Sequence, residues 1–343
     1  MSARPGLSIE RWTPLSAAAV AALAALAVVL AFGPLFLGAN AVDRLTTLFI
    51  YVILGVMWNA LAGYGGLVSV GQQAFFGLGA YAAIRLASFG VPVYAALALA
   101  GVLTGLVALA MSPFALRLRG GEFAIGMWVI AEVCHLLVNL DPLINGETGT
   151  SLISLNAFAP QARRDYTYWL ALGAMTLLVA VMFSLLRGRL GSSVQAIRDS
   201  EEAAASLGVR VLAAKRILFV VAGAGCGMAG TLYLATAISF QPAGYFSVQW
   251  TAYMIFMALV GGLGTFEGPI IGAVVFFVLE SLFGASGVWY LVGLGATAVV
   301  FALYLPRGLW GTLETRFGIR LLPVGYRVKA RAEASTAPAA KSG

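Results

Sequence analysis

Charged residues are scarce in this sequence of 343 residues. Only 10% of the residues are Asp, Glu, Lys or Arg, against about 25% in soluble globular proteins, and 61% are hydrophobic. Too few polar groups are present to cover a surface in water, which excludes an ordinary soluble domain and predicts a protein embedded in lipid. The alternating pattern of a β-barrel is also missing, so we expect α-helices to be the spanning elements.

Residue types that carry catalysis or bind metals are equally rare. One histidine and two cysteines, Cys134 and Cys226, supply no metal site and indicate no disulfide. The lysines follow Ala214, Val328 and Ala340, so a Gly-Lys-Ser/Thr phosphate-binding loop is impossible. No Ser/His/Asp arrangement or Gly-x-Ser-x-Gly motif is evident. We therefore expect a non-catalytic chain without a metal or cofactor of its own. If ATP drives it, another polypeptide binds the ATP.

Ten apolar segments follow one another along the chain. They lie at about 15–37, 45–63, 67–89, 91–116, 122–140, 166–186, 216–238, 248–263, 268–284 and 287–305. A membrane span needs about 20 apolar residues, so we predict an all-α polytopic membrane protein with about eight to ten transmembrane helices. The third and ninth segments are rich in glycine and are candidates for broken or re-entrant spans.

The first apolar segment is interpreted as a retained span. It runs from Leu15 to Leu37, longer than the roughly 7–15 residues of a signal-peptide core, although Ala39-Asn40-Ala41 resembles a cleavage site. We expect residues 1–14 to form a cytoplasmic segment and residues 15–305 the transmembrane domain. Residues 306–343 are expected to form a cytoplasmic tail, partly disordered because the sequence from Arg327 onward is rich in Ala, Lys and Arg.

Basic residues are distributed unevenly over the predicted loops. With ten spans and the amino terminus inside, only Arg44, Arg85, Arg163 and Arg164 of the 21 basic residues fall outside. This imbalance predicts that both termini are cytoplasmic. The net charge of +7 comes from basic residues spread over these loops and the tail. No basic domain is present, so nucleic acid is not an expected partner.

The segment from Arg187 to Lys215 concentrates much of this charge in one cytoplasmic loop. A helix is predicted to begin at Ser192-Ser193 and to end at Gly208. Its apolar stripe comprises Ala196, Ile197, Ala204 and Leu207, and its charged positions are Arg198, Asp199, Glu201 and Glu202. The small residues Ala203 to Ala205 leave a flat surface on which a partner could pack. The alternative is a solvated surface helix.

Polar residues also occur at membrane depth. The stretch Gly63–Ala83 holds Tyr64, Ser69, Gln72 and Gln73, which are costly in lipid unless they face protein or water. They either line a solute path or form hydrogen bonds between packed helices. The motif Gly65-Gly66-Leu67 with Ser69 recurs as Gly261-Gly262-Leu263 with Thr265. Paired interrupted segments of this kind indicate a pathway at their interface, and the alternative is a chance likeness between two glycine-rich helix-packing motifs.

Two further acids fall in apolar segments. Glu132 precedes His135 by three residues, which places both on one helix face and suggests either a proton relay or a buried polar pair. Glu280 lies alone in the ninth segment, and the sequence names no partner for it.

Three groups of residues resemble the membrane subunit of ABC importers for branched-chain amino acids, the LivM-like permeases. The first runs from Gly63-Tyr64-Gly65-Gly66 through Ser69, Gly71, Phe75, Gly77, Gly79, Ala80 and Tyr81. The second, Ala196 to Ala204 with Leu207-Gly208, is similar to the family's coupling helix, which docks on the ATPase. The third comprises Gly230 to Tyr233, Pro242, Phe246, Gly261 to Thr265, Gly268-Pro269 and Gly272-Ala273. The likeness covers about residues 45 to 305. At Thr148-Gly149-Thr150 the chain departs from the family, which more often has a second glycine there.

The resemblance implies a permease subunit in a bacterial cytoplasmic membrane. Its partners would be cytoplasmic ATPases that hold ATP and Mg²⁺, a second homologous permease subunit and a periplasmic or extracellular solute-binding protein. The implied coupling residues are Ala196, Arg198, Asp199, Glu201, Glu202, Ala203, Ala204 and Gly208. The candidate path residues are Tyr64, Ser69, Gln72, Gln73, Phe75, Tyr81 and Glu132. Family members also carry urea, short amides and other amino acids. A proton-coupled secondary transporter that uses Glu132 and His135 is a further alternative.

Overall fold

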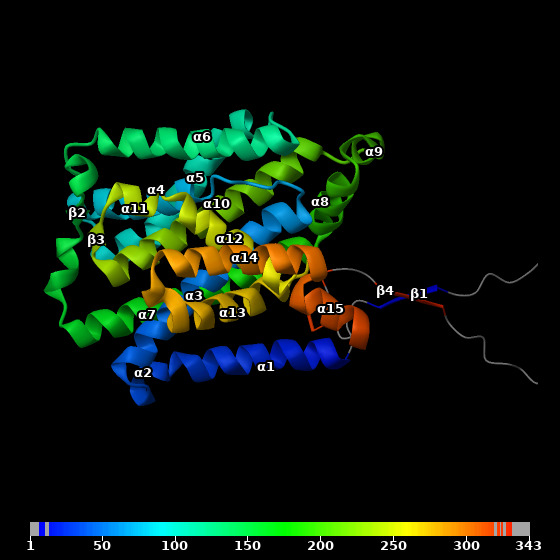
Figure 1. Cartoon of the computed structure of the whole chain (residues 1–343), viewed down its shortest axis with the longest axis horizontal. Helices are drawn as coiled ribbons and strands as arrows, with labels where there is room; N and C mark the ends of the chain where they lie inside the picture. The colour runs from blue at the N-terminus through cyan, green and yellow to red at the C-terminus, as the bar shows by residue number, and fades with distance from the viewer. Residues whose placement is uncertain (1–6, 11–13, 319–320, 323, 325–326, 331–343) are drawn as a thin grey trace, which may run out of the picture.

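The structure is a computed structural model that describes residues 7–10, 14–318, 321–322, 324 and 327–330. Long helices run roughly along one axis of the molecule (Figure 1). The short elements β2, β3 and α2 lie at one end of this bundle, and α8, α9 and α15 lie at the other. The predicted all-α membrane architecture is confirmed.

Nine helical segments in the described part of the chain are long and apolar enough to cross a membrane. The single helices are α1 (Pro14–Ala31), α5 (Val93–Ala115), α6 (Gly120–Asn139), α7 (Pro160–Arg187) and α10 (Val211–Ala237). The composite ones are α3 (Ala39–Asn59) with the π-helix η1 (Ala60–Tyr64), α11 (Pro242–Tyr245) with α12 (Val248–Gly261), α13 (Gly268–Phe283) with η4 (Gly284–Ser286), and α14 (Val288–Tyr304) with α15 (Gly308–Phe317).

The third predicted segment is a broken span. Residues 65–72 are irregular, and the helix α4 (Gln73–Ser88) begins only after them. Gly66 has φ +66°, and a Cβ on Gly71 would lie 1.9 Å from the Met127 carbonyl oxygen on α6. Irregular backbone is tolerated in a membrane only where protein surrounds it, and this close packing meets that condition. The break expected in the ninth segment is wrong, because α13 is continuous.

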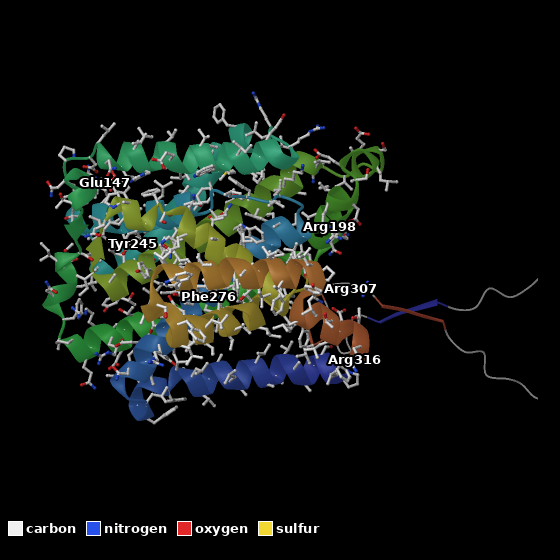
Figure 2. All side chains as sticks on the ribbon, in the orientation of Figure 1. Glu147, Arg198, Tyr245, Phe276, Arg307 and Arg316 are labelled. Atoms are coloured by element: carbon white, nitrogen blue, oxygen red, sulfur yellow. The ribbon has the colours of Figure 1, made fainter. Side chains whose placement is uncertain are left out.

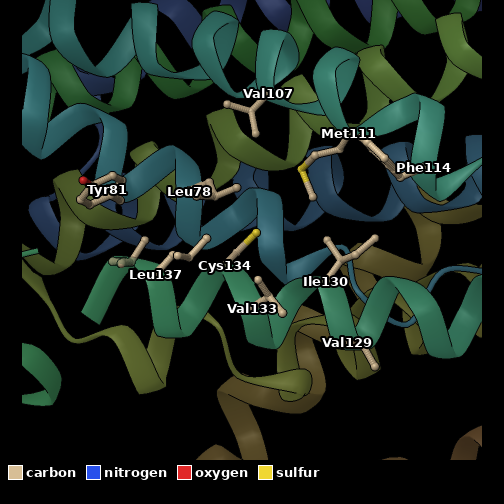
Figure 3. A pocket seen from close by; sticks show the side chains of 11 residues that line it. Leu78, Tyr81, Val107, Met111, Phe114, Val129, Ile130, Val133, Cys134 and Leu137 are labelled. Carbon is tan, nitrogen blue, oxygen red and sulfur yellow. The ribbon is translucent and has the colours of Figure 1, made fainter. Parts of the chain in front are cut away.

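The centre of the bundle forms where α10 packs against α3, α4 and α5. Small residues allow this approach: a Cβ on Gly79 of α4 would lie 2.1 Å from the Gly227 oxygen of α10. In contrast α6 leaves an apolar groove of about 530 Å³ against α4 and α5, lined by residues such as Leu78, Met111 and Cys134 (Figure 3). A groove with so few polar groups suits contact with lipid.

The loop at one end of the bundle is ordered by short elements. They are η2 (Gly146–Thr148), β2 (Thr150–Ser151) and η3 (Ile153–Ala157), together with α2 (Gly33–Phe36) from the first connection. Strand β2 pairs antiparallel with β3 (Ser239–Phe240), in the register Thr150↔Phe240 and Ser151↔Ser239. Gly149 has φ +77° and lies against the Phe240 oxygen, so the glycine that the sequence retains at this position is required.

The first and last described strands pair with each other beyond the α15 end of the bundle. Strand β1 (Leu7–Glu10) pairs antiparallel with β4 (Arg327–Ala330), beyond α15 (Figure 1). Four residues of the predicted tail thus form a strand, the expectation of a partly disordered tail stays a prediction, and residues 331–343 lie outside the described part. Strands β1 and β4 lie beyond the end that carries Arg198, Arg307 and Arg316, whereas Glu147 lies at the other end (Figures 1 and 2). Which end faces the cytoplasm stays a prediction.

Candidate functional site

The charged loop 187–215 contains two short helices, not one. Helix α8 spans Arg189–Asp199 and α9 spans Glu201–Ser206. The predicted start at Ser192 is wrong, because α8 already begins at Arg189. A Cβ on Gly191 would lie 1.6 Å from the Leu186 oxygen, so only glycine permits this earlier turn into the helix. Ser200 is extended (φ −161°, ψ 111°) and its hydroxyl caps α9 at the Ala203 amide. Gly208 ends α9 with φ +83°, as expected.

The predicted apolar stripe of this segment is divided between two faces. Ile197 and Ala204 are buried against the bundle, together with Val194. Ala196 and Leu207 are instead exposed, and the Leu207 side chain is 84% exposed. Leu207 directly follows α9, one turn after exposed Ala203, and Ala205 of the same helix is also exposed. Helix α9 lies at the tip of the molecule (Figure 1). We call these three residues the α9 surface. It is small, apolar and open to a partner.

The two glutamates of α9 differ in their surroundings. Glu201 accepts a hydrogen bond from Lys215 Nζ at 2.7 Å, and the Lys215 side chain is only 10% exposed. Arg119 lies 4.0 Å from the other Glu201 oxygen. Because a buried ammonium requires a partner, Glu201 holds α9 against α10. Glu202 is exposed, so of the two predicted ATPase contacts it is the one that points away from its own chain.

Arg198 connects the same segment to the membrane spans. Its Nη1 donates to the Gly63 oxygen at 2.8 Å, while Nε and Nη2 lie 3.1 and 3.0 Å from Asp199 Oδ1. Gly63 belongs to the π-helix η1, where the wider turn leaves a carbonyl without its usual α-helical partner. Arg198 therefore acts at the junction between α8 and the start of the broken span, in addition to any contact with another subunit.

At this junction the second glycine motif meets the residues just before the first one. Asn59 Nδ2 donates to the Thr265 oxygen at 2.8 Å, and the Gly264 amide donates to Asn59 Oδ1 at 2.9 Å. A Cβ on Gly63 would lie 2.5 Å from the Gly264 nitrogen. Arg198 lies against Gly66 of the first motif and near Gly264 of the second, so it connects the two motifs. The repeat in the sequence gave no sign of the contacts with Asn59 and Gly63.

Five predicted path residues lie buried inside the chain. Ser69, Gln72, Gln73 and Phe75 are at most 1% exposed, and Tyr64 is 5% exposed. The Ser69 hydroxyl accepts from the Gly71 amide and from Gln72 Nε2, at 3.3 and 3.2 Å. Thr251 of α12 donates to Gln73 Oε1. These bonds correspond to the packed-bundle alternative, and a role in the solute path stays a prediction for these residues. Gln72 Oε1 has no partner among the described residues.

Tyr81 helps to hold the loop at the β2 end. Its hydroxyl donates to Asp141 Oδ2 at 2.6 Å, and Arg85 Nη2 lies 2.5 Å from Asp141 Oδ1. The Leu143 amide donates to the same oxygen at 2.9 Å. Partial burial alone would raise the pKa of Asp141, but the hydrogen bonds from Tyr81, Leu143 and Arg85 outweigh it, and the pKa is lowered. Tyr81 thus has a clear structural function at this position.

His135 joins Glu132 to a residue that the sequence did not single out. His135 Nδ1 lies 3.2 Å from Glu132 Oε1, and Nε2 lies 2.8 Å from Glu147 Oε1 in the loop. The ring stacks on Phe246 with centroids 5.5 Å apart. Glu132 is 59% exposed, so the expected burial of the pair is wrong for this residue. Burial would raise the pKa of Glu147, but hydrogen bonds from Asn139 and the Ala243 amide, with His135, lower it.

Glu280 acquires a partner that the sequence could not name. The Tyr51 hydroxyl lies 2.8 and 2.7 Å from its two carboxylate oxygens, although the residues are 229 positions apart. Only the packing of α13 against α3 brings them together. The single available signal was an isolated acid in an apolar segment.

The nine apolar helices and the broken span define a multi-pass membrane protein. The family model for the permease component of branched-chain amino acid transport systems matches residues 40–306, and the chain belongs to this family. It is 29% identical to the high-affinity branched-chain amino acid transport permease LivM of Salmonella typhimurium and 28% identical to that of Escherichia coli. Each match covers 84% of this chain and 74% of the relative. The fructose import permease FrcC of Rhizobium meliloti is 28% identical over 59% of this chain and 58% of its own length. No solved structure matches the chain significantly.

Proposed function

We propose that this chain is the permease subunit of an ATP-driven ABC importer that carries branched-chain or related amino acids across the cytoplasmic membrane. Membership of the branched-chain amino acid permease family supports the transport role. The observation that carries the ATP-driven part is the α9 surface, an open apolar patch on a helix pair that is itself fixed to the spans. Such a surface on a chain without a nucleotide-binding loop calls for an ATPase partner.

The mechanism that we propose uses α8 and α9 as a rigid lever. An ATPase that grips the α9 surface moves both helices, because Glu201–Lys215 holds α9 to α10. Arg198 then transmits the displacement to Gly63, at its contact with Gly264 of the second glycine motif. Both motifs lie where a span is interrupted or begins, so a shift there reorients α4 and α13 relative to the rest of the bundle.

The complete importer in this proposal contains further subunits. A second homologous permease completes the path, two ATPases bind ATP and Mg²⁺, and a solute-binding protein delivers the amino acid. The ordered loop at the β2 end supplies the outer docking face, since hydrogen bonds from Tyr81, Arg85 and His135 fix it to α4 and α6. The chain itself performs no catalysis.

Uptake by the assembled complex in proteoliposomes tests the proposal. ATP inside the vesicles and solute-binding protein outside should drive accumulation of labelled leucine. Failure of any branched-chain amino acid to accumulate, with uptake of urea, acetamide or fructose instead, would reassign the solute. Collapse of uptake by an uncoupler at constant ATP would favour the proton-coupled alternative at Glu132 and His135. Uptake that needs ATP and withstands the uncoupler supports the importer.

A further inference from the structure

An acidic side chain occupies the membrane-spanning part of the bundle without a basic partner. Glu280 is half-buried on α13, one turn after Phe276, which lies between the two ends of the molecule (Figure 2). Among the residues that the structure describes, Tyr51 is the hydrogen-bond donor to Glu280, and no basic side chain forms an ion pair with it. A carboxylate at this depth is costly, and one hydroxyl satisfies only part of its hydrogen-bonding capacity.

Aromatic rings from several helices converge on this carboxylate. Tyr233 of α10, Tyr253 of α12 and Tyr290 of α14 lie within electrostatic reach of Glu280. Phe276 packs edge-on against Tyr51, with centroids 5.0 Å apart, and lies 4.6 Å from the Tyr253 ring. A carboxylate without a basic partner attracts a cation, and an apolar aromatic surrounding that holds little water strengthens that attraction, above all for an organic ammonium.

The neighbouring hydroxyl of Tyr290 lacks a partner. Tyr290 is 8% exposed, and its oxygen is buried without a hydrogen bond in the described part of the chain. A buried unpaired hydroxyl is unfavourable unless a ligand satisfies it. Tyr290 also lines a cavity of about 320 Å³ between α13 and α14, together with Leu279, Phe283 and Leu294. This volume lies in the range of roughly 300–1,000 Å³ that is typical of small-molecule sites.

We propose that Glu280, Tyr51 and Tyr290 form a transit site for an aliphatic α-amino acid. Glu280 and the surrounding rings receive the ammonium group, the Tyr290 hydroxyl donates to the carboxylate, and Leu279, Phe283 and Leu294 receive the aliphatic side chain. The assignment rests on the proposed import of amino acids. It locates a contact with solute between α3, α13 and α14, away from the glutamines of the broken span.

The test compares variants in the complete importer, reconstituted with its binding protein. Glu280→Gln keeps the shape and the bond to Tyr51 but removes the charge. We expect leucine import to fall at least about tenfold, whereas ATP hydrolysis stimulated by the solute-binding protein should stay within about twofold of wild type. Glu280→Asp should restore part of the import. Glu122→Gln, the same change at an exposed carboxylate on α6, should leave both activities unchanged.

A purely structural tie between α3 and α13 makes a different prediction. In that case Tyr51→Phe would reduce import as much as Glu280→Gln, and both would lower the melting temperature. The transit site predicts a smaller loss for Tyr51→Phe and unchanged melting for Glu280→Gln. Tyr290→Phe should raise the KM for import several-fold. If the wild-type importer carries leucine and Glu280→Gln carries it equally well, the transit site is wrong but the proposed function stands. Absence of leucine import in the wild type overturns the proposed function.

Discussion

The two ends of the bundle use charge in opposite ways. At the β2 end, Asp141 and Glu147 bond to Tyr81, Arg85 and His135 and fix the long loop to α4 and α6. At the other end, Glu201 and Arg198 bind α8 and α9 to the spans, and the α9 surface stays free. The first end therefore presents a fixed face, and in the proposed importer the second transmits a movement from the ATPase.

The largest expected effect comes from blocking the α9 surface. Ala203→Arg places a long charged side chain where we propose that the ATPase packs, and import should fall below the detection limit. Because Ala203 is exposed, the melting temperature of the isolated chain should not change. Ala203→Ser is the matched control and should retain import. If Ala203→Arg imports normally, the ATPase docks elsewhere.

The next effect concerns transmission from α8 to the spans. Arg198→Met removes the bond to the Gly63 oxygen and should lower import about tenfold, while ATP hydrolysis continues. Arg164→Met removes an arginine from an exposed pair with Asp43 at the opposite end, 3.0 Å apart, and should change stability by less than about 1 kcal/mol without affecting import. Equal import by both variants would show that Arg198 is not part of the coupling.

A moderate loss of stability is expected at Lys215. Lys215→Ala leaves Glu201 without its close partner and opens space between α9 and α10. Unfolding in mild detergent should become easier by about 1–3 kcal/mol, because a partly buried carboxylate loses its charged donor. The double variant Lys215→Ala with Glu201→Ala should recover part of this loss. If the losses of Lys215→Ala and Glu201→Ala measured separately simply add in the double variant, the pair contributes nothing.

The smallest effect is a pH dependence at the β2 end. The folded-state pKa of Asp141 lies below its unfolded value, so its contribution to stability is complete above the ordinary carboxyl pKa of about 4 and is lost as the pH falls through the folded value. Glu147 acts in the same direction. Thermal melting between pH 7 and pH 3 should therefore decline less steeply for Asp141→Asn than for wild type. If the melting temperature of both proteins declines equally with pH, the Asp141 carboxylate does not contribute to stability in this way.

Part of the candidate site was readable from local sequence. The glycine density of 67–89 predicted the broken span, and Gly208 predicted the end of α9, because glycine supplies backbone conformations that other residues resist. The extent of the coupling helix was not readable. Its break at Ser200 and its early start at Arg189 depend on capping and on the packing of Gly191 against Leu186.

The sequence by itself determined that this chain is a helical membrane protein. Its apolar composition favours lipid over water, and its apolar segments are long enough to span a bilayer as helices. It also singled out the charged loop 187–215 as the segment on which a partner is expected to dock. Tertiary structure alone decided which polar groups meet: Tyr51 with Glu280, Asn59 with Gly264, and His135 with Glu147. These pairs join segments distant in the chain or separated by a turn, and their contact depends on helix packing, which no local pattern encodes.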